Sequence, residues 1–418
     1  MLFIHQVAAI ISPLGDTDLS STEAYAGKFL SQRRYTQLLC VVAAVLLTIC
    51  ATKIRQWMLF ESIDMVNDFI PWYQHIVAYG RLRSLEASFT NYSPPYVYCL
   101  SVASLLNGRL PDQVIVKLAV FPFLIIGSFA CWVLCRKLGC SRTRCFIAAL
   151  IFPFLPEVAL NSYKWGQSDV TYAALLLSFA ALYLSNKRVL AVGVFGIALA
   201  FKLQAIFAAP VLLALVVSGE IPVYYLAMAP AAYFAMQIPS HLAGRSGTQL
   251  ASVYQQQYGV FWYLSLGAPN PYFITSLHSK VQPFSAAIST IGILVAAAFS
   301  LWLVDYYRKH PLLRTPQGFV MLMTICLLIE PFLLPRMHER YFIAGNCFLF
   351  ILAIRRKSVA PIAAVMQLAI VLCYLPFLEG RFAPRRELVT PFLLTTASIV
   401  LLFLSFRNQA TCPDNMTP

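Results

Sequence analysis

Two aspartates followed by a run of aromatic residues form the first stretch of the sequence whose side chains could do chemistry. Asp64 and Asp68 lie four residues apart, so a helix would present both carboxylates on one face. An amphipathic, aromatic segment that includes Trp72 follows, and the stretch ends in Asn-Tyr-Ser-Pro-Pro-Tyr at residues 91–96. We expect those last residues not to form regular helix, because each proline biases the preceding residue toward extended geometry. Acids beside such a segment, next to a membrane span, favour an active site at the membrane interface; an ordinary solvated loop is the alternative.

A second polar cluster lies at residues 161–169, which read Asn-Ser-Tyr-Lys-Trp-Gly-Gln-Ser-Asp. Gln167 and Asp169 stand at the mouth of a predicted span, where a carboxylate tends to face a cavity or a partner. Trp165 could equally belong to the belt of aromatic residues found at membrane interfaces. We favour a functional role for Gln167 and Asp169.

A third cluster places Lys202 and Gln204 inside a long apolar run. A lysine at the centre of a bilayer costs on the order of 3 kcal/mol. The ammonium of Lys202 therefore either reaches back to the interface or faces a lipid phosphate. Both interpretations remain open at this point.

A fourth cluster, residues 334–341, contains Arg336, His338, Glu339 and Arg340 between two apolar runs. The planar guanidinium of arginine matches the geometry of a phosphate. A zinc site is not expected, because the HExxH pattern is absent. A solvated hairpin turn is the alternative, and we favour a functional role.

Composition predicts a membrane protein. The chain has 418 residues, of which 59% are hydrophobic and 11% are charged, whereas soluble domains carry roughly 25% charged residues. The net charge of +14 comes from Lys and Arg that stand mostly in short clusters between apolar runs, as orientation by positive charge on the cytoplasmic side produces. We therefore expect no nucleic-acid partner. The 11 cysteines are scattered without a CxxC pair, so neither a metal centre nor a disulfide framework is expected.

The order of apolar runs and basic clusters predicts an all-α polytopic protein with about 11–13 membrane spans and both termini in the cytoplasm. We expect a cytoplasmic tail over residues 1–36, one membrane domain over residues 37–406 and a second tail over residues 407–418. In this scheme residues 57–95 form the first outer loop and residues 241–283 form a long, aromatic outer loop. The first span covers residues 38–56. The arginines at residues 381–386 also fall outside, against the charge rule. Either one span is miscounted or these arginines attract an anion, and we favour the second.

Three segments are predicted to depart from simple spans. Residues 96–107 are apolar but too short to cross, so they read as interfacial or re-entrant. Residues 145–160 are short and bent by prolines. Residues 189–219 favour two half-length segments interrupted near Lys202, an arrangement that exposes polar backbone to a membrane site; a single span is the alternative.

Taken together, these clusters resemble the Gpi-mannosyltransferase-related branch of the GT-C glycosyltransferases, polytopic enzymes that use polyprenyl-phosphate sugars. The resemblance runs from about Asp64 to Tyr341 and rests on the order of its motifs. It implies a GT-C-like fold with interfacial helices after the first span. Two residues depart from the family pattern: Asp68 stands where an apolar residue is expected, and Lys164 interrupts the second motif.

The resemblance implies transfer of a hexose, with mannose the expected sugar, from a polyprenyl-phosphate donor to an extracytoplasmic glycan or glycolipid by inverting single displacement. Asp64 matches the position of the catalytic base, and Asp68 keeps the choice of acid open. The implied donor-phosphate residues are Lys202, Arg336, His338 and Arg340. The implied substrate-binding residues are Trp72, Tyr92, Trp165, Gln167, Asp169, Gln204, Glu339 and Tyr341.

No cofactor is expected, since a lipid monophosphate leaving group does not obviously need a divalent metal. The expected location is the plasma (inner) membrane, in contact with its lipids, with the active site on the extracytoplasmic side. Two other functions fit the same polar residues: a transporter or lipid flippase, and a polysaccharide polymerase or ligase that uses a lipid diphosphate.

Overall fold

The computed structural model describes Thr48 and residues 51–258, 263–274, 285–381 and 385–411. The predicted first span and N-terminal tail lie almost entirely outside the described residues. Contacts divide the chain into residues 1–56 and residues 57–418, and everything that follows concerns the second unit.

The described residues from 57 onward are mostly helical, which confirms the predicted all-α membrane class. Six helices are long and apolar enough to cross a membrane, and five shorter apolar helices accompany them in the described residues. The six are Asp112–Lys137, Arg142–Trp165, Ser285–Lys309, Pro316–Leu333, Lys357–Leu378 and Val389–Asn408. The five are Pro94–Leu106, Asp169–Leu184, Arg188–Phe201, Leu203–Val217 and Val223–Ala235. The protein is therefore a polytopic integral membrane protein.

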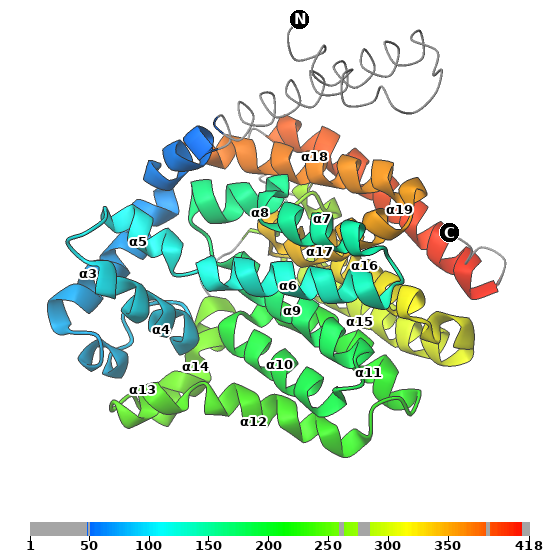
Figure 1. Ribbon diagram of the computed structural model, residues 1–418, viewed down its shortest axis with the longest axis horizontal. Coiled ribbons are helices and arrows are strands. Elements are labelled where there is room, and N and C mark those ends of the chain that lie inside the picture. The colour runs from blue at the N-terminus through cyan, green and yellow to red at the C-terminus, as the bar shows by residue number, and fades with distance from the viewer. Residues whose placement is uncertain (1–47, 49–50, 259–262, 275–284, 382–384, 412–418) are drawn as a thin grey trace, which may run out of the picture. The chain divides into compact units, whose positions relative to one another are not determined.

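A layer of helices surrounds α9 (Asp169–Leu184), which is apolar on all sides and buried along most of its length. It packs between α6 (Phe121–Lys137) and α10 (Arg188–Phe201), and α10 packs in turn on α12 (Met228–Ala235), as Figure 1 shows. On another side α9 contacts α17 (Ile343–Arg355). The first residue of this central helix is Asp169, so the core of the fold delivers that carboxylate to one end of the helix layer.

Two pairs of consecutive helices also pack together: α16 (Pro316–Leu333) contacts α17, and α18 (Ala360–Leu378) contacts α19 (Val389–Thr411). Short connections favour such neighbours. α15 (Ser285–Lys309) instead contacts α11 (Ala209–Val217), which is distant from it in the sequence.

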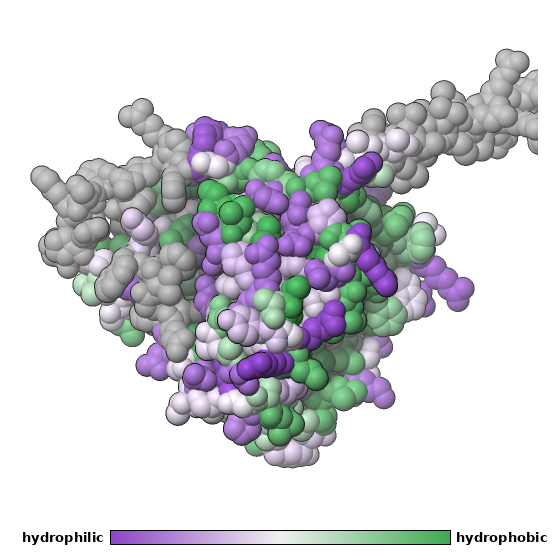
Figure 2. All heavy atoms as spheres, turned by 90° about the vertical axis from the view of Figure 1, so that its left-hand side faces the viewer, coloured by the Kyte–Doolittle hydropathy of each residue, from purple (hydrophilic) through white to green (hydrophobic). Residues whose placement is uncertain are grey.

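The segment after residue 60 forms short helices rather than a span. A π-helical turn, η1 (Met65–Phe69), leads into α3 (Ile70–Tyr79), and α4 (Pro94–Ala103) follows after a loop. Figure 2 looks onto the face that carries α3, α4 and α5 (Asp112–Leu118), where hydrophilic and hydrophobic side chains are mixed. A mixed surface of this kind is typical of segments that lie in a membrane interface.

One expectation for this segment is wrong. We expected residues 91–96 not to enter a regular helix, yet α4 begins at Pro94, with Pro94 and Pro95 in its first turn. Proline fits there because the first N–H groups of a helix have no partner inside the helix, so nothing is lost when they are missing. Ser93 before them is extended, as the rule for residues preceding proline requires.

Two predicted interruptions are confirmed. α10 ends at Phe201, Lys202 is extended, and the chain resumes as the 3-10 turn η6 (Leu203–Ala208) before α11. Residues 142–165 are divided at their prolines into α7 (Arg142–Ile151), η4 (Phe152–Phe154), α8 (Pro156–Ala159) and η5 (Leu160–Trp165).

The predicted outer loop 241–283 contains regular structure where it is described. It contains the end of α13 (Ile238–Leu242), the whole of α14 (Gly247–Tyr258) and the strand β1 (Ser265–Leu266). β1 pairs in parallel with β2 (Met337–His338), with Ser265 opposite Met337 and Leu266 opposite His338. The fourth polar cluster is therefore a paired strand followed by the turn η12 (Glu339–Phe342), and not a solvated hairpin.

The arginines near residue 381 are placed only in part. Arg381 forms exposed ion pairs with Glu379 and Glu387, at 2.5 and 3.7 Å. Glu379 and Glu387 therefore balance the charge of Arg381, and the expectation that the three arginines attract an anion stays a prediction. The side chains of Arg385 and Arg386 lie outside the described residues.

Close packing of α10 on α12 gives a prediction with a control in the same helix. A Cβ added at Gly196 would collide with the backbone carbonyl of Ala229, whereas a Cβ added at Gly193 would meet nothing within 4 Å. We expect Gly196→Ala to lower the free energy of unfolding by about 1–3 kcal/mol, since the helices must separate. Gly193→Ala should leave stability unchanged or raise it by up to about 1 kcal/mol, because alanine favours helix.

Thermal unfolding of both variants in detergent micelles measures this difference. Equal melting temperatures for the two variants would contradict the close approach of α10 and α12.

Candidate active site

One cavity of about 750 Å³ collects most of the residues singled out in the sequence. They come from η1, α3, the loop before α4, the turn before α9, the break at Lys202 and the segment from β2 to η12. The predicted residues that line it are Asp64, Asp68, Trp72, Tyr92, Gln167, Lys202, Gln204, Arg336, His338, Glu339, Arg340 and Tyr341. Trp165 and Asp169 lie behind its wall and are fully buried.

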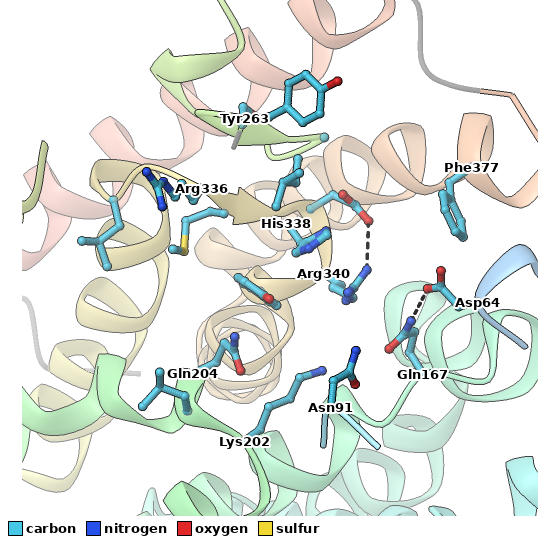
Figure 3. Close-up of a pocket in the computed structure, with 18 of the residues that line it drawn as sticks. Asp64, Asn91, Gln167, Lys202, Gln204, Tyr263, Arg336, His338, Arg340 and Phe377 are labelled. Carbon is cyan, nitrogen blue, oxygen red and sulfur yellow. Dashed lines mark hydrogen bonds and ion pairs between the residues drawn. The ribbon is translucent and has the colours of Figure 1, made fainter. Parts of the chain in front are cut away.

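The carboxylate of Asp64 is held by the turn that precedes α9. Trp165 Nε1 donates a hydrogen bond to Asp64 Oδ2 at 3.0 Å, and Gln167 Nε2 donates to the same oxygen, as Figure 3 shows for Gln167. Tyr92 fixes Gln167 in turn, because its hydroxyl donates to Gln167 Oε1 at 3.0 Å. Both donors use Oδ2, so among the described residues Oδ1 of Asp64 accepts no hydrogen bond and is left for a ligand in the cavity.

Asp68 lines the same cavity but is held differently. No described residue forms a hydrogen bond or ion pair with its carboxylate. Burial, followed by the negative charge of Asp64, raises the pKa of Asp68, and the charge of Arg340 opposes this rise. Of the two acids, Asp64 is therefore the one whose orientation the protein fixes.

The carboxylate of Asp169 forms ion pairs with two basic side chains. It pairs with Lys202 Nζ through Oδ1, and its Oδ2 accepts a hydrogen bond from Asn161 Nδ2 at 3.0 Å and lies 3.7 Å from Arg340 Nε. The side chain has no exposed surface. Asp169 thus orients Lys202 and Arg340 from behind and does not reach a ligand in the cavity itself.

Arg340 is charged, nearly buried and only loosely engaged. Its guanidinium lies 3.7 Å from Asp169 and 3.8 Å from Glu339, both beyond hydrogen-bonding distance. It lies over the ring of Trp165, 5.3 Å from the ring centre. Arg340 Nε has no hydrogen-bond partner among the described residues. Burial opposes the charge of Arg340, but Asp169, Tyr341 and Glu339 outweigh it and raise the pKa of its guanidinium.

His338 ends the strand β2, and Arg336 immediately precedes that strand. Burial, with the charges of Arg340 and Lys202, lowers the pKa of His338 well below its ordinary value, so its imidazole is neutral and can donate a hydrogen bond but carries no charge. Arg336 has a positive φ of 61°, unusual for a residue with a side chain, and its N–H donates to Leu264 O at 2.7 Å. Figure 3 shows Arg336 on the side of the cavity away from Asp64, with His338 and Arg340 between them.

Glu339 adds a titratable carboxyl to the group. It is 5% exposed, and burial raises its pKa to about 7, although Arg340 opposes this rise. The acids Asp64 and Asp169 add to the effect. Glu339 is therefore mainly protonated below neutral pH and ionised above it.

Aromatic rings complete the walls. Phe69 contacts Trp72, Tyr92 and Tyr96 edge to face, with ring centres 5.1–5.8 Å apart. Lys202 Nζ lies 5.4 Å from the centre of the Tyr92 ring, and burial raises the pKa of Tyr341 to about 12, so its phenol stays neutral. The cavity thus combines apolar walls with a few fixed polar groups, as binding sites for amphipathic ligands do.

Several lining residues were not among the predicted site residues. Asn91, Tyr263, Ser265 and Phe377 line the cavity, and Phe377 also stacks on Trp165 with ring centres 4.5 Å apart. Asn91 belongs to the motif at residues 91–96, and Tyr263 and Ser265 belong to the predicted outer loop 241–283. Phe377 carries no signal in the sequence and becomes visible only when distant helices are brought together.

The described residues contain no candidate metal site. Within them no three His, Cys, Asp or Glu side chains are grouped so that they could hold a metal ion.

Comparison with known proteins places the fold. The sequence matches no family profile, and no curated protein resembles it in sequence. A crystal structure of ArnT from Cupriavidus metallidurans bound to undecaprenyl phosphate is similar, with a TM-score of 0.50 and 13% identity over 88% of this chain and 77% of that chain. The apo structure of the same protein has a TM-score of 0.48, with 14% identity and the same coverage. The chain therefore shares the all-helical membrane fold of ArnT, in agreement with the all-α polytopic class that its sequence predicted.

Proposed function

We propose that this protein transfers a sugar from a polyprenyl-phosphate donor to an acceptor hydroxyl. One observation carries the proposal: an oriented carboxylate, that of Asp64, and the buried guanidinium of Arg340 belong to residues that line one cavity of a membrane protein. The fold adds support, because the similar ArnT structure, of the GT-C glycosyltransferase family, is bound to undecaprenyl phosphate.

Asp64 is the proposed general base. Its Oδ2 is held by Trp165 and Gln167, which leaves Oδ1 to accept the proton of the acceptor hydroxyl. The acceptor oxygen then attacks the anomeric carbon of the donor as the bond to the lipid phosphate breaks, in a single displacement that inverts the configuration. The proton moves to Asp64 and the bonding electrons leave with the phosphate.

The basic side chains are proposed to stabilise the departing lipid phosphate. Arg340 lines the cavity and forms only long ion pairs with Asp169 and Glu339, at 3.7 and 3.8 Å, and Lys202 is held nearby through Asp169. The neutral imidazole of His338 supplies a further donor. Such preorganised charges act strongly at low dielectric, where they need no reorganisation during the reaction.

The sugar, the acceptor and the side of the membrane belong to the same proposal. We take the sugar to be a hexose, with mannose the first to test, because the motifs of residues 161–169, 201–204 and 335–341 resemble those of mannosyltransferases. The acceptor is a glycan or glycolipid outside the cytoplasm of a plasma (inner) membrane, because the basic clusters between spans place Asp64 on the outer side.

Donor choice tests the proposal. Purified protein is incubated with a labelled lipid-monophosphate hexose and, separately, with a lipid-diphosphate oligosaccharide. Transfer from the monophosphate supports the proposal. Transfer from the diphosphate alone would indicate a polymerase or ligase, and movement of intact lipid across vesicles without transfer would indicate a flippase.

Removal of the base should abolish transfer but not donor binding. We expect Asp64→Asn to lower kcat by about 10²–10⁴-fold, the usual contribution of general base catalysis, with the donor Kd nearly unchanged. Asp305→Asn, which alters an exposed acid on α15, serves as the control. Near-normal turnover by Asp64→Asn would remove Asp64 as the base.

The fork geometry of Arg340 should matter for donor affinity. Arg340→Lys keeps the charge but loses the planar set of donors. We expect the donor Kd to rise by about tenfold, which corresponds to about 1.4 kcal/mol, whereas Arg308→Lys on the exposed end of α15 should change nothing. Binding of labelled donor measures both variants, and an unaltered Kd for Arg340→Lys and for Arg336→Lys would disprove the phosphate role.

Glu339 should make donor binding depend on pH. The donor is a phosphodiester, whose single charge stays constant between about pH 6 and pH 8. Because the pKa of Glu339 is raised to about 7, a rising pH adds a negative charge beside Arg340 and weakens the attraction for the phosphate. We expect the donor Kd to increase by about three- to tenfold across that range.

Titration of donor affinity against pH measures this effect. Glu339→Gln should remove the dependence, and Asp305→Asn should keep it. A wild-type Kd that is independent of pH would show that Glu339 does not oppose the phosphate.

A further inference from the structure

A buried lysine outside the cavity engages the chain just before Asp64. Lys117 belongs to α5 and is 3% exposed. Its ammonium donates to three backbone carbonyls, those of Trp57 at 2.7 Å, Met58 at 3.3 Å and Phe60 at 2.5 Å. Within the described residues no carboxylate lies within 4 Å of this ammonium, so its three N–H groups are satisfied by backbone alone. A buried charge without a counter-ion is costly, which indicates a specific task for this side chain.

The three carbonyls lie at the end of a helical turn that finishes at Leu59. The last carbonyls of a helix have no partner inside it and carry partial negative charge, so an ammonium is the natural group to hold them. Asp64 follows Phe60 by only four residues. Lys117 therefore fixes the point at which the chain leaves the helix and turns toward the candidate base.

Further hydrogen bonds connect this segment to Asp64. Ser62 Oγ donates to Trp165 O at 2.8 Å and accepts a hydrogen bond from Met65 N at 3.2 Å. Trp165 then donates its indole N–H to Asp64. The backbone around Asp64 is thus attached to the same turn whose side chains hold the carboxylate.

Gly166, in the middle of that turn, shows how closely these parts pack. Its φ of 82° is left-handed, and an added Cβ would collide with Met65 Cε and lie 3.3 Å from Lys117 Cε. The stem of Lys117 therefore packs beneath the turn that carries Trp165 and Gln167, while its ammonium holds the segment that carries Asp64.

We propose that Lys117 is a positioning residue that holds Asp64 in register with Trp165 and Gln167, an inference that rests on the proposed function. Lys117 touches neither the cavity nor the phosphate residues. Its removal should therefore reduce the rate of the chemical step and leave donor affinity unchanged, because misplacement of a catalytic group acts on the transition state.

The test compares Lys117→Met, which keeps an unbranched stem without the charge, with Lys137→Met, an exposed lysine at the far end of the same predicted span. We expect Lys117→Met to lower kcat by about tenfold or more with a donor KM within about twofold of wild type, and Lys117→Arg to recover part of the rate. Lys137→Met should behave as wild type. A wild-type kcat for Lys117→Met overturns the proposal.

A double variant separates positioning from general loss of structure. In the Asp64→Asn background, Lys117→Met should cause no further loss of kcat, since its effect passes through Asp64. A second multiplicative loss overturns the proposal. If Lys117→Met does not fold, Ser62→Ala takes its place, with the same fall in kcat expected and a normal kcat contradicting the account.

Hydrogen exchange distinguishes failure of this inference from failure of the proposed function. Exchange of the amides of residues 60–69 should be faster in Lys117→Met than in wild type and Lys137→Met, with α9 unchanged. If wild-type protein transfers no sugar, the proposed function fails, and the exchange rates still decide whether Lys117 holds this segment. Unchanged exchange would overturn the anchoring role.

Discussion

A carboxylate that is fully buried at the end of a membrane helix must be neutralised by positive charge. The arrangement of the segments around the cavity depends on the two basic side chains that neutralise Asp169. Asp169 stands at the first position of α9, where the helix dipole favours a negative charge. Lys202 reaches it from the break between α10 and η6, and Arg340 approaches it from the turn after β2. Three segments far apart in the chain are thereby drawn to one point, and that point forms the rear wall of the cavity.

The same arrangement divides the acids and bases by role. Asp169 neutralises charge from behind, so Lys202 and Arg340 can stay inside the protein while both residues line the cavity. Asp64 stands apart from this group and is held by neutral donors, an indole and an amide, which orient a carboxylate without consuming its charge. Glu339 keeps a raised pKa because acids and apolar walls surround it. A site built in this way holds charge where a phosphate would need it and leaves one carboxylate oxygen free to accept a proton.

The sequence predicted the parts of this structure that depend on local chemistry. The membrane class follows from composition, and the break at Lys202 follows from the cost of a lysine in an apolar run. The start of α4 was misread because prolines that disfavour the interior of a helix are well suited to its first turn. The roles of Phe377 and Lys117 could not be predicted, because a phenylalanine or a lysine near a span is common. Only tertiary packing places Phe377 against Trp165 and Lys117 against backbone carbonyls. The place of Asp169 behind the wall likewise depends on partners 33 and more residues away.

The most direct test of the account is a structure of the protein with a non-hydrolysable polyprenyl-phosphate sugar bound. The account predicts that the phosphate lies within hydrogen-bonding distance of Arg340 and that Asp64 Oδ1 faces the anomeric carbon from the opposite side. A phosphate bound elsewhere, or a sugar with Asp64 on the same side as the leaving group, would contradict it.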